Sequence, residues 1–375
     1  MIYRGTLHTT DGLPFIRAML AGVDELGGCF VPTDITPLPA PFFKNIAEMS
    51  ARDVAYVVAN AMIGNDYTAE ELRRLVDEWI VDDMVLSRAG KGIYALEPWA
   101  GTTMSQYDMV GRLQAILLRN CYDRMEVSLD SVFFSPSMGD SCAAISQAFK
   151  DVIGKSPVML QSAGSLSDIE KRQMNDMVDS EMLYVVACDQ QSLWRLCCRI
   201  VNNTSVFAGR KPVLVGDANV ASLMARVYCF FESFRLLAVN EVDGTVCICP
   251  DRCNAGDMLA AHVAVDMGLP VDIVEPTSVE NEDDVIVDAY SQCGYILNPR
   301  AAERWKALYN HVDEKEVCGV FINPSHPAKF RSRLEPLLNR VIMLPNKLHF
   351  KDVSNVRHKT VAPSVNALKN CFTNY

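Results

Sequence analysis

The chain has 375 residues, of which 49% are hydrophobic and 22% charged, so it can bury a large core and form two domains. This composition excludes intrinsic disorder and collagen-like repeats. The formal net charge is −11 and the basic residues are scattered singly, which argues against nucleic acid as a partner. No apolar run is long enough to span a membrane and polar residues interrupt the amino terminus, so we expect a cytoplasmic protein without a membrane partner.

The chain contains thirteen cysteines, an odd number with no C-x-x-C pair, which favours reduced thiols over disulfides. Cys247 and Cys249 alternate within an apolar run, so both are expected on one face of a strand. Zinc ligands are usually spaced to wrap a turn, and we therefore expect no metal site.

Two helices are predicted early in the chain, at 51–64 and 68–86, and the second starts with a capping pattern. From about residue 127, β-branched runs alternate with amphipathic stretches of helical period, which predicts an α/β fold. The predicted strands are 127–134, 158–161, 183–187, 213–215, 246–249, 271–274, 317–322 and 341–344. The predicted helices between them are 141–150, 167–178, 191–201, 219–237, 257–267, 300–309 and 327–337. The tail after residue 350 is polar and weakly periodic, and we expect it to be peripheral.

Two polar turns, at 135–141 and 250–257, each follow a predicted strand and precede a predicted helix. In an open α/β sheet such turns bind ligands, because free N–H groups and the helix dipole favour an anion. A plain capped turn explains the first equally well, and acidic residues in the second disfavour phosphate. His326 precedes a proline, and a histidine in that setting is more often a structural hydrogen-bonding group than a catalyst.

Four ordered segments resemble threonine synthases, which belong to the fold-type II group of pyridoxal-phosphate enzymes. Residues 22–32 are similar to the motif A-G-L-x-x-x-G-G-L-x-V-P, and 164–173 to G-x-x-S-x-x-Q. Residues 217–219 fall where the family has S-I-N, and 325–330 resemble the closing H-P-A-K-F stretch. The resemblance implies two open, mostly parallel sheets flanked by helices. It also implies an amino-terminal subdomain over 1–95, α/β lobes over 96–245 and 246–350, and a tail over 351–375.

Residues 96–108 align with the family segment H-G-P-T-x-x-F-K-D, whose lysine forms the Schiff base with pyridoxal phosphate. Tyr107 stands at the lysine position, and a phenol cannot form an imine. The family's phosphate loop corresponds to 253–257, where Asp257 is expected to be an uncompensated carboxylate that repels a dianion. The candidate catalytic residue is Tyr107, and the candidate pocket residues are Gly139, Asp140, Ser141, Asn219, Asn254, Gly256, Asp257 and His326.

The departure at Tyr107 favours a threonine synthase-like pseudoenzyme that binds a small metabolite or a protein partner, with no cofactor expected. One alternative is a divergent enzyme that binds pyridoxal phosphate non-covalently or uses Tyr107 as an acid or base without a cofactor. Another is a phosphohomoserine lyase that uses a different lysine, such as Lys91 or Lys329. The expected ligand is an amino acid or a phosphate-bearing metabolite, and a homodimer is left open.

Overall fold

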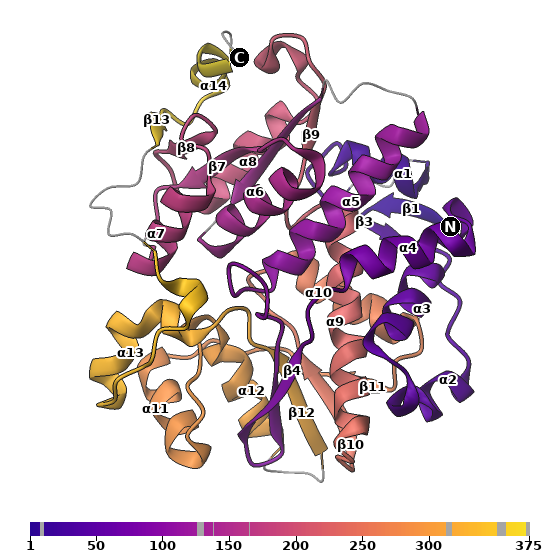
Figure 1. Ribbon diagram of the computed structural model, residues 1–375, viewed down its shortest axis with the longest axis vertical. Coiled ribbons are helices and arrows are strands. Elements are labelled where there is room, and N and C mark those ends of the chain that lie inside the picture. The colour runs from indigo at the N-terminus through magenta and orange to yellow at the C-terminus, as the bar shows by residue number, and fades with distance from the viewer. Residues whose placement is uncertain are drawn as a thin grey trace. The chain divides into compact units, whose positions relative to one another are not determined.

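The computed structural model describes the chain except residues 8–10, 126–130, 138, 165, 313–316, 351–357 and 373–375. The described chain forms two compact units, each built from separate stretches of sequence (Figure 1). Unit 1 comprises Met1–Thr33, Tyr107–Ser222 and Phe350–Tyr375, and unit 2 comprises Asp34–Gln106 and Leu223–His349. The boundaries predicted at 95/96 and 245/246 follow sequence order, whereas the two units interleave along the chain.

Unit 1 is built around a five-stranded sheet in the order β13-β8-β7-β6-β9, in which every pairing is parallel. The strands are β6 (Val132–Ser137), β7 (Val158–Ser162), β8 (Leu183–Val186), β9 (Pro212–Leu214) and β13 (Lys359–Val361). The helices are α5 (Tyr107–Met125), α6 (Asp140–Ile153), α7 (Asp168–Met177), α8 (Gln190–Ile200) and α14 (Val365–Phe372). A small antiparallel sheet, β2-β1-β3, precedes them with β1 (Ile2–Gly5), β2 (Leu13–Pro14), α1 (Phe15–Ala21) and β3 (Phe30–Pro32).

Unit 2 has a second five-stranded sheet in the order β11-β10-β12-β5-β4, and only the β4–β5 pairing is antiparallel. The strands are β4 (Val85–Gly90), β5 (Ile93–Glu97), β10 (Thr245–Cys249), β11 (Val271–Ile273) and β12 (Val317–Ile322). The helices are α2 (Ala40–Lys44), α3 (Ala51–Ile63), α4 (Ala69–Trp79), α9 (Val220–Val239, whose first turn belongs to unit 1), α10 (Ala255–Asp266), α11 (Glu282–Cys293), α12 (Ala302–Val312) and α13 (Arg331–Leu338). The two sheets confirm the predicted α/β class with open, mostly parallel sheets.

Several helices begin where the sequence supplies a capping residue. The Thr68 hydroxyl accepts from the Glu71 N–H at the start of α4, and the Glu71 carboxylate accepts from the Thr68 N–H in return. Ser50 with Asp53 caps α3, and Ser167 with Glu170 caps α7, in the same way. None of the described helices is both long enough and apolar enough to cross a membrane.

Two predicted elements are wrong in part or in whole. The helix predicted over 68–86 ends at Trp79, and strand β4 begins at Val85. The strand predicted over 341–344 has no partner strand, and Val341 and Met343 are 75% and 81% exposed. A β-branched run without a neighbouring strand cannot satisfy its backbone groups by pairing and stays irregular. Residues 127–130 of the predicted strand 127–134 lie outside the described residues.

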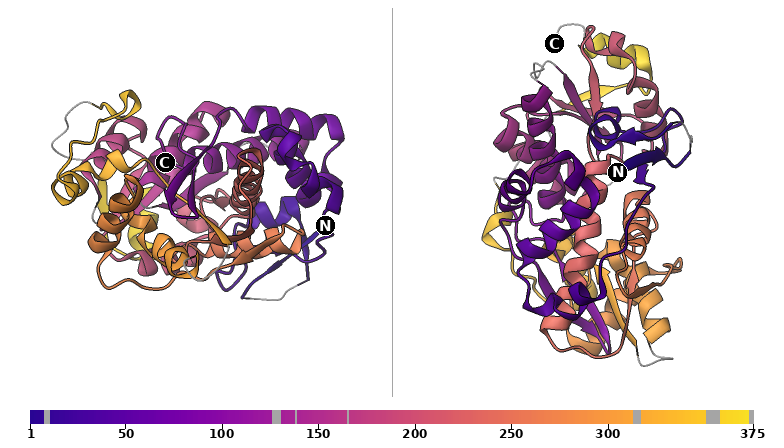
Figure 2. Two further views of the ribbon diagram at one scale, coloured as in Figure 1. Left: turned by 90° about the horizontal axis from the view of Figure 1, so that it is seen from below. Right: turned by 90° about the vertical axis from the view of Figure 1, so that its right-hand side faces the viewer.

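The described part of the carboxyl-terminal tail is part of the core of unit 1, which corrects the expectation of a peripheral segment. β13 pairs in parallel with β8, and α14 buries Leu368 and Phe372 completely. The Phe372 ring stacks on Phe207 at a centroid distance of 5.0 Å. The yellow helix lies beside the magenta elements of unit 1 in Figure 1 and in the right-hand view of Figure 2. Two large apolar side chains on one helical face are enough to dock a short amphipathic helix.

Candidate active site

In unit 1 the turn after β6 places Gly139 between the strand and α6, as the sequence predicts. Gly139 has φ 48° and ψ −111°, a conformation that residues with a Cβ rarely adopt. Asp140 and Ser141 follow in the first turn of α6, and both are buried. The turn therefore presents a helix amino terminus at the carboxyl edge of the sheet, which is where anionic ligands bind in α/β folds.

Tyr107 is the first residue of α5, and its hydroxyl donates to Asp217 Oδ2 at 3.2 Å. Asp217 lies in the turn after β9, which α5 holds in place through Gln114. Gly216 N–H donates to Gln114 Oε1 at 2.9 Å, and Gln114 Nε2 donates to the Gly216 carbonyl at 2.8 Å. Gly216 has φ 110°, and a Cβ there would lie 2.7 Å from Ser135 Oγ. The tyrosine and the carboxylate are therefore positioned by a fixed contact between helix and turn.

Asn219 is 1% exposed, and its carboxamide is used entirely by backbone groups of unit 1. Its Nδ2 donates to the carbonyls of Met19 and Leu214, both at 2.9 Å, and its Oδ1 accepts from Ala221 N–H at 3.1 Å. Asn219 therefore shapes the turn before α9, and both of its described Nδ2 hydrogen bonds go to backbone carbonyls.

In unit 2 the turn between β10 and α10 satisfies most of its own amides. Asn254 Oδ1 accepts from the N–H groups of Gly256 and Asp257 at 3.0 and 3.3 Å, and so caps α10. Asp251 Oδ1 accepts from Cys253 N–H at 2.9 Å. An anion that bound here would have to displace the Asn254 side chain from the helix terminus.

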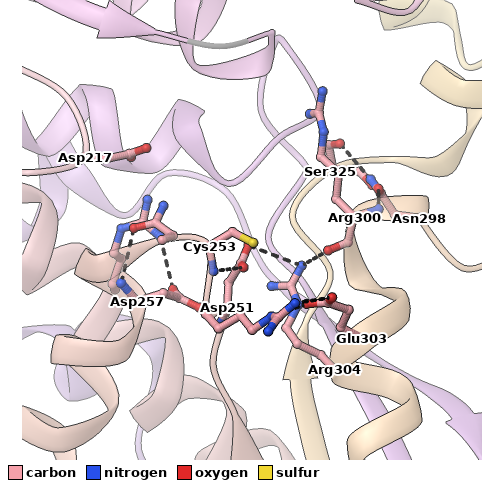
Figure 3. A network of polar contacts seen from close by, with 12 residues as sticks. Asp217, Asp251, Cys253, Asp257, Asn298, Arg300, Glu303, Arg304 and Ser325 are labelled. Carbon is pink, nitrogen blue, oxygen red and sulfur yellow. Dashed lines mark hydrogen bonds and ion pairs between the residues drawn. The ribbon is translucent and has the colours of Figure 1, made fainter. Parts of the chain in front are cut away.

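The Asp257 carboxylate is paired with Arg226, which corrects the expectation of an uncompensated charge. Arg226 Nη1 lies 3.0 Å from Asp257 Oδ1, and the two side chains are 1% and 2% exposed. Asp257 Oδ2 also accepts from Asp251 N–H at 2.8 Å. Figure 3 shows Asp257 and Asp251 in one polar network, in which Arg304 contacts the Asp251 carboxylate at 3.7 Å and donates to the Arg300 carbonyl. The turn thus carries carboxylates whose charge is balanced by arginines that the sequence analysis did not identify.

The segment after β12 is held by backbone hydrogen bonds from residues just before α5. Gln106 N–H donates to the Pro324 carbonyl at 2.8 Å, and His326 N–H donates to the Met104 carbonyl at 3.1 Å. His326 Nδ1 accepts from Ala328 N–H at 3.1 Å. Burial lowers the pKa of His326 to about 4, and the positive charge of Lys329 adds to this effect. A neutral, capping histidine agrees with the structural role that the sequence favours.

Three residues that the sequence analysis did not include among the candidate site residues form a hydrogen-bonded chain at the same edge of the sheet. Tyr295 hydroxyl donates to Glu97 Oε1 at 2.9 Å, and Asn323 Nδ2 donates to the Tyr295 oxygen at 2.5 Å. Glu97 ends β5 and Asn323 follows β12, so the carboxyl ends of neighbouring parallel strands were the available signal. Burial raises the pKa of Glu97, and hydrogen bonds from Tyr295 and Ser87 oppose this effect. Burial also raises the pKa of Tyr295, and the Glu97 charge raises it further.

The sequence-predicted residues thus fall into two groups. In unit 1 the turns after β6 and β9 are neighbours, because these two strands pair in parallel. They carry Gly139, Asp140, Ser141 and Asn219, and Tyr107 at the start of α5 reaches the turn after β9 through Asp217. In unit 2 the turns after β10 and β12 are neighbours for the same reason, and they carry Asn254, Gly256, Asp257 and His326.

Comparison with known proteins gives one consistent result. Residues 2–79 match the family model described as threonine synthase N terminus. The threonine synthase of Serratia marcescens is 21% identical over 400 residues, which cover 90% of this chain and 91% of that protein. The threonine synthase of Escherichia coli strain K12 is 21% identical with the same coverage.

Solved structures share the fold over the whole chain. The crystal structure of threonine synthase from Escherichia coli has a TM-score of 0.86 at 18% identity and covers 100% of both chains. The pyridoxal-phosphate-bound threonine synthase of Brucella melitensis has a TM-score of 0.80 at 17% identity, with coverage of 100% and 99%. From the sequence, no cofactor is expected. This expectation is wrong, because these relatives are threonine synthases and one of the structures with this fold was solved with pyridoxal phosphate bound.

Proposed function

We propose that this chain, which is threonine synthase-like in sequence and in fold, binds pyridoxal phosphate without a covalent link and has lost threonine synthesis. The observation that carries the proposal is Tyr107, which by resemblance stands at the Schiff-base position. Its hydroxyl is bonded to Asp217 at 3.2 Å, and a phenol supplies no amine for an imine. The protein would then be a pseudoenzyme that retains the family's ligand.

The balance of charge in unit 2 is compatible with an anionic ligand. Arg226 balances Asp257, so the carboxylate that the sequence suggested would repel a phosphate is neutralised within the protein. The amino terminus of α10, a helix of 12 residues, supplies N–H groups once the Asn254 side chain turns away. Asn254 and Gly256 are the residues of this unit that would hold a phosphate group.

When bound, pyridoxal phosphate supplies an aldehyde and an electron-withdrawing ring. In this chain the Tyr107 hydroxyl, directed by Asp217, can hold or move a proton, but it cannot replace the missing amine. The hydrogen bond between Tyr107 and Asp217 favours a second candidate function, in which Tyr107 acts as an acid or base on the bound ligand.

Lys91 and Lys329, the two lysines considered as replacements for the Schiff-base lysine, are poorly placed to form an imine with pyridoxal phosphate. Lys91 precedes β5 and lies at the edge of the sheet opposite Glu97, where β5 ends. Lys329 is 1% exposed in the turn after β12, where its charge acts on His326. A buried lysine would need to lose its proton and its present contacts to attack an aldehyde.

The proposal is tested by equilibrium dialysis of the purified chain against pyridoxal phosphate, followed by borohydride reduction and peptide mass mapping. We expect saturable binding that dialysis reverses, no phosphopyridoxyl-lysine after reduction, and no threonine from phosphohomoserine. A reduced adduct on any lysine, or threonine formation by the unmodified chain, would overturn the proposal. Asn60→Leu, at an exposed position of α3, is the matched control for the variants described below.

A further inference from the structure

Buried carboxamides near the strand ends are satisfied by the protein at Asn219 and Asn298. Asn298 Nδ2 donates to Ser325 O and Oγ at 2.9 Å, and its Oδ1 accepts from Arg300 N–H at 2.9 Å. In unit 2 Asn323 differs: its side chain is 0% exposed, and among the described residues its Oδ1 has no hydrogen-bond partner, as is also true of Gln161 Oε1 near the end of β7 in unit 1. A buried acceptor without a donor costs about 1–3 kcal/mol, so the unpartnered oxygen of Asn323 requires a physical explanation.

The neighbouring groups determine which end of the Asn323 carboxamide is unpartnered. Tyr295 has a single hydroxyl proton, and it is donated to Glu97 Oε1. The Tyr295 oxygen must therefore accept from Asn323, which directs Nδ2 toward the tyrosine. The carboxamide oxygen is thus the end that turns away from Tyr295 and lacks a donor.

Asn323 is also held rigidly. Its own N–H donates to the Leu96 carbonyl at 2.8 Å, and Gln106 N–H donates to the carbonyl of the next residue, Pro324, at 2.8 Å. Ser325 is fixed in turn by Asn298. With the backbone pinned on both sides, the side chain cannot reach a different donor without breaking its bond to Tyr295.

The position of Asn323 is the one at which α/β sheets bind ligands. It follows β12, which lies between β10 and β5 and runs parallel to both. The Asn254 turn follows β10 at the same edge of the sheet. Adjacent strands lie about 4.8 Å apart, so a small ligand held at the Asn254 turn can also reach the end of β12.

We propose that Asn323 is a ligand-binding residue, whose carboxamide oxygen accepts a hydrogen bond from a protonated nitrogen of the bound small molecule. Tyr295 and Glu97 are positioning residues, because they orient the carboxamide, and the Glu97 carboxylate polarises the chain so that the oxygen becomes a stronger acceptor. This inference rests on the proposed function, since pyridoxal phosphate carries one nitrogen, in its ring.

The experiment compares the binding of pyridoxal phosphate with that of its 1-deaza analogue, in which a C–H group replaces the ring nitrogen. We expect the unmodified chain to bind pyridoxal phosphate about tenfold more tightly, or better, because the analogue leaves the acceptor unpartnered. Asn323→Leu should bind both molecules with the affinity of the analogue, and Asn60→Leu should keep the full preference. Circular dichroism and thermal unfolding report whether each variant folds.

Tyr295→Phe provides a second test if Asn323→Leu fails to fold. It keeps the ring, removes the hydroxyl that orients Asn323, and should reduce the preference for pyridoxal phosphate several-fold. Equal affinity of the unmodified chain for the two molecules, or an unchanged preference in both variants, would overturn the inference while leaving the proposed function standing. If the unmodified chain binds neither molecule, the proposed function and the inference both fail.

Discussion

Tyr107 and Asp217 provide the most direct residue-level test of the proposed loss of activity. In Tyr107→Lys an amine replaces the phenol at the start of α5, and we expect a reducible adduct with pyridoxal phosphate. Threonine synthesis should still be absent, because two more residues depart from the family segments. By resemblance, Ala100 stands at the histidine of H-G-P-T-x-x-F-K-D, and Pro324 at the threonine of the closing T-A-H-P-A-K-F stretch. Absorbance in the visible region and phosphate release from phosphohomoserine are the two measurements.

Tyr107→Phe is the matched control for this variant, since it removes the hydroxyl without adding an amine. It should bind pyridoxal phosphate reversibly, so that dialysis removes the absorbance of the cofactor, and borohydride should leave no adduct at residue 107. Turnover of phosphohomoserine by Tyr107→Lys would show that the lysine was the only missing group.

His326 gives a residue-level prediction about pH. Its pKa is lowered to about 4 in the folded chain from an ordinary value of 6.5, chiefly by burial. In the unfolded chain the His326 imidazole binds a proton below pH 6.5, whereas in the folded chain it stays neutral down to about pH 4. Acid therefore stabilises the unfolded state, and the free energy of unfolding falls as pH falls through this window. Allowing for partial exposure of the ring, we expect a loss of about 2 kcal/mol between these two pH values.

The measurement is the free energy of unfolding in urea at several pH values between 4 and 7 for the unmodified chain and for His326→Asn. Asparagine can still accept from Ala328 N–H, so the variant keeps the cap but cannot titrate. Its stability should fall less steeply with acid. Identical slopes for the two proteins would contradict the assigned pKa.

At the level of elements, the buried ion pair between α9 and α10 gives the clearest prediction. Asp257→Asn leaves the Arg226 guanidinium, which is 1% exposed, without its carboxylate. Breaking a buried pair on one side typically costs about 3–5 kcal/mol. We therefore expect the urea midpoint to fall strongly in this variant.

The double variant Arg226→Met with Asp257→Asn separates the effect of the unpaired charge on stability from the effect of altered packing. Replacing both charges removes the unpaired cation, so part of the lost stability should return. If the double variant is as unstable as the sum of the single variants, the pair is not coupled, and the charge-balance argument for the turn is wrong.

For the whole molecule, the thirteen free cysteines give a prediction about accessibility. Only Cys253 and Cys293 are exposed, four are half-buried and seven are buried. In the native chain we expect two thiols to react rapidly with Ellman's reagent, and all thirteen after unfolding. Burial and the nearby Asp251 carboxylate raise the pKa of Cys253, so we expect it to react more slowly than a thiol with an ordinary pKa but faster than the buried cysteines.

Cys253→Ser should lower the rapidly reacting number by one, and peptide mapping of the labelled chain identifies the remaining site. Rapid labelling of any buried thiol, such as Cys249, would contradict the packing of β10. Dithiothreitol should leave the free energy of unfolding unchanged, since the described cysteines are free thiols. The cytoplasmic location and the homodimer stay predictions.

The sequence by itself determined the α/β class, most elements and the turns that carry Gly139 and Asn254. These features depend on local hydrophobic period and on capping residues such as Thr68, which act within one or two turns of chain. The resemblance to threonine synthases likewise rests on short ordered motifs. The candidate site residues of each unit could therefore be located on the correct turns without a structure.

Only the tertiary structure decided which charged groups are paired and which buried polar groups have a hydrogen-bond partner. The Arg226–Asp257 pair joins residues 31 positions apart, and the contact of Tyr295 with Glu97 joins residues 198 positions apart. The strand expected over 341–344 failed for lack of a partner strand, and the tail joined the core because Leu368 and Phe372 found an apolar surface to cover. Pairing and burial are properties of distant neighbours, and hydrophobic period along the chain contains no information about them.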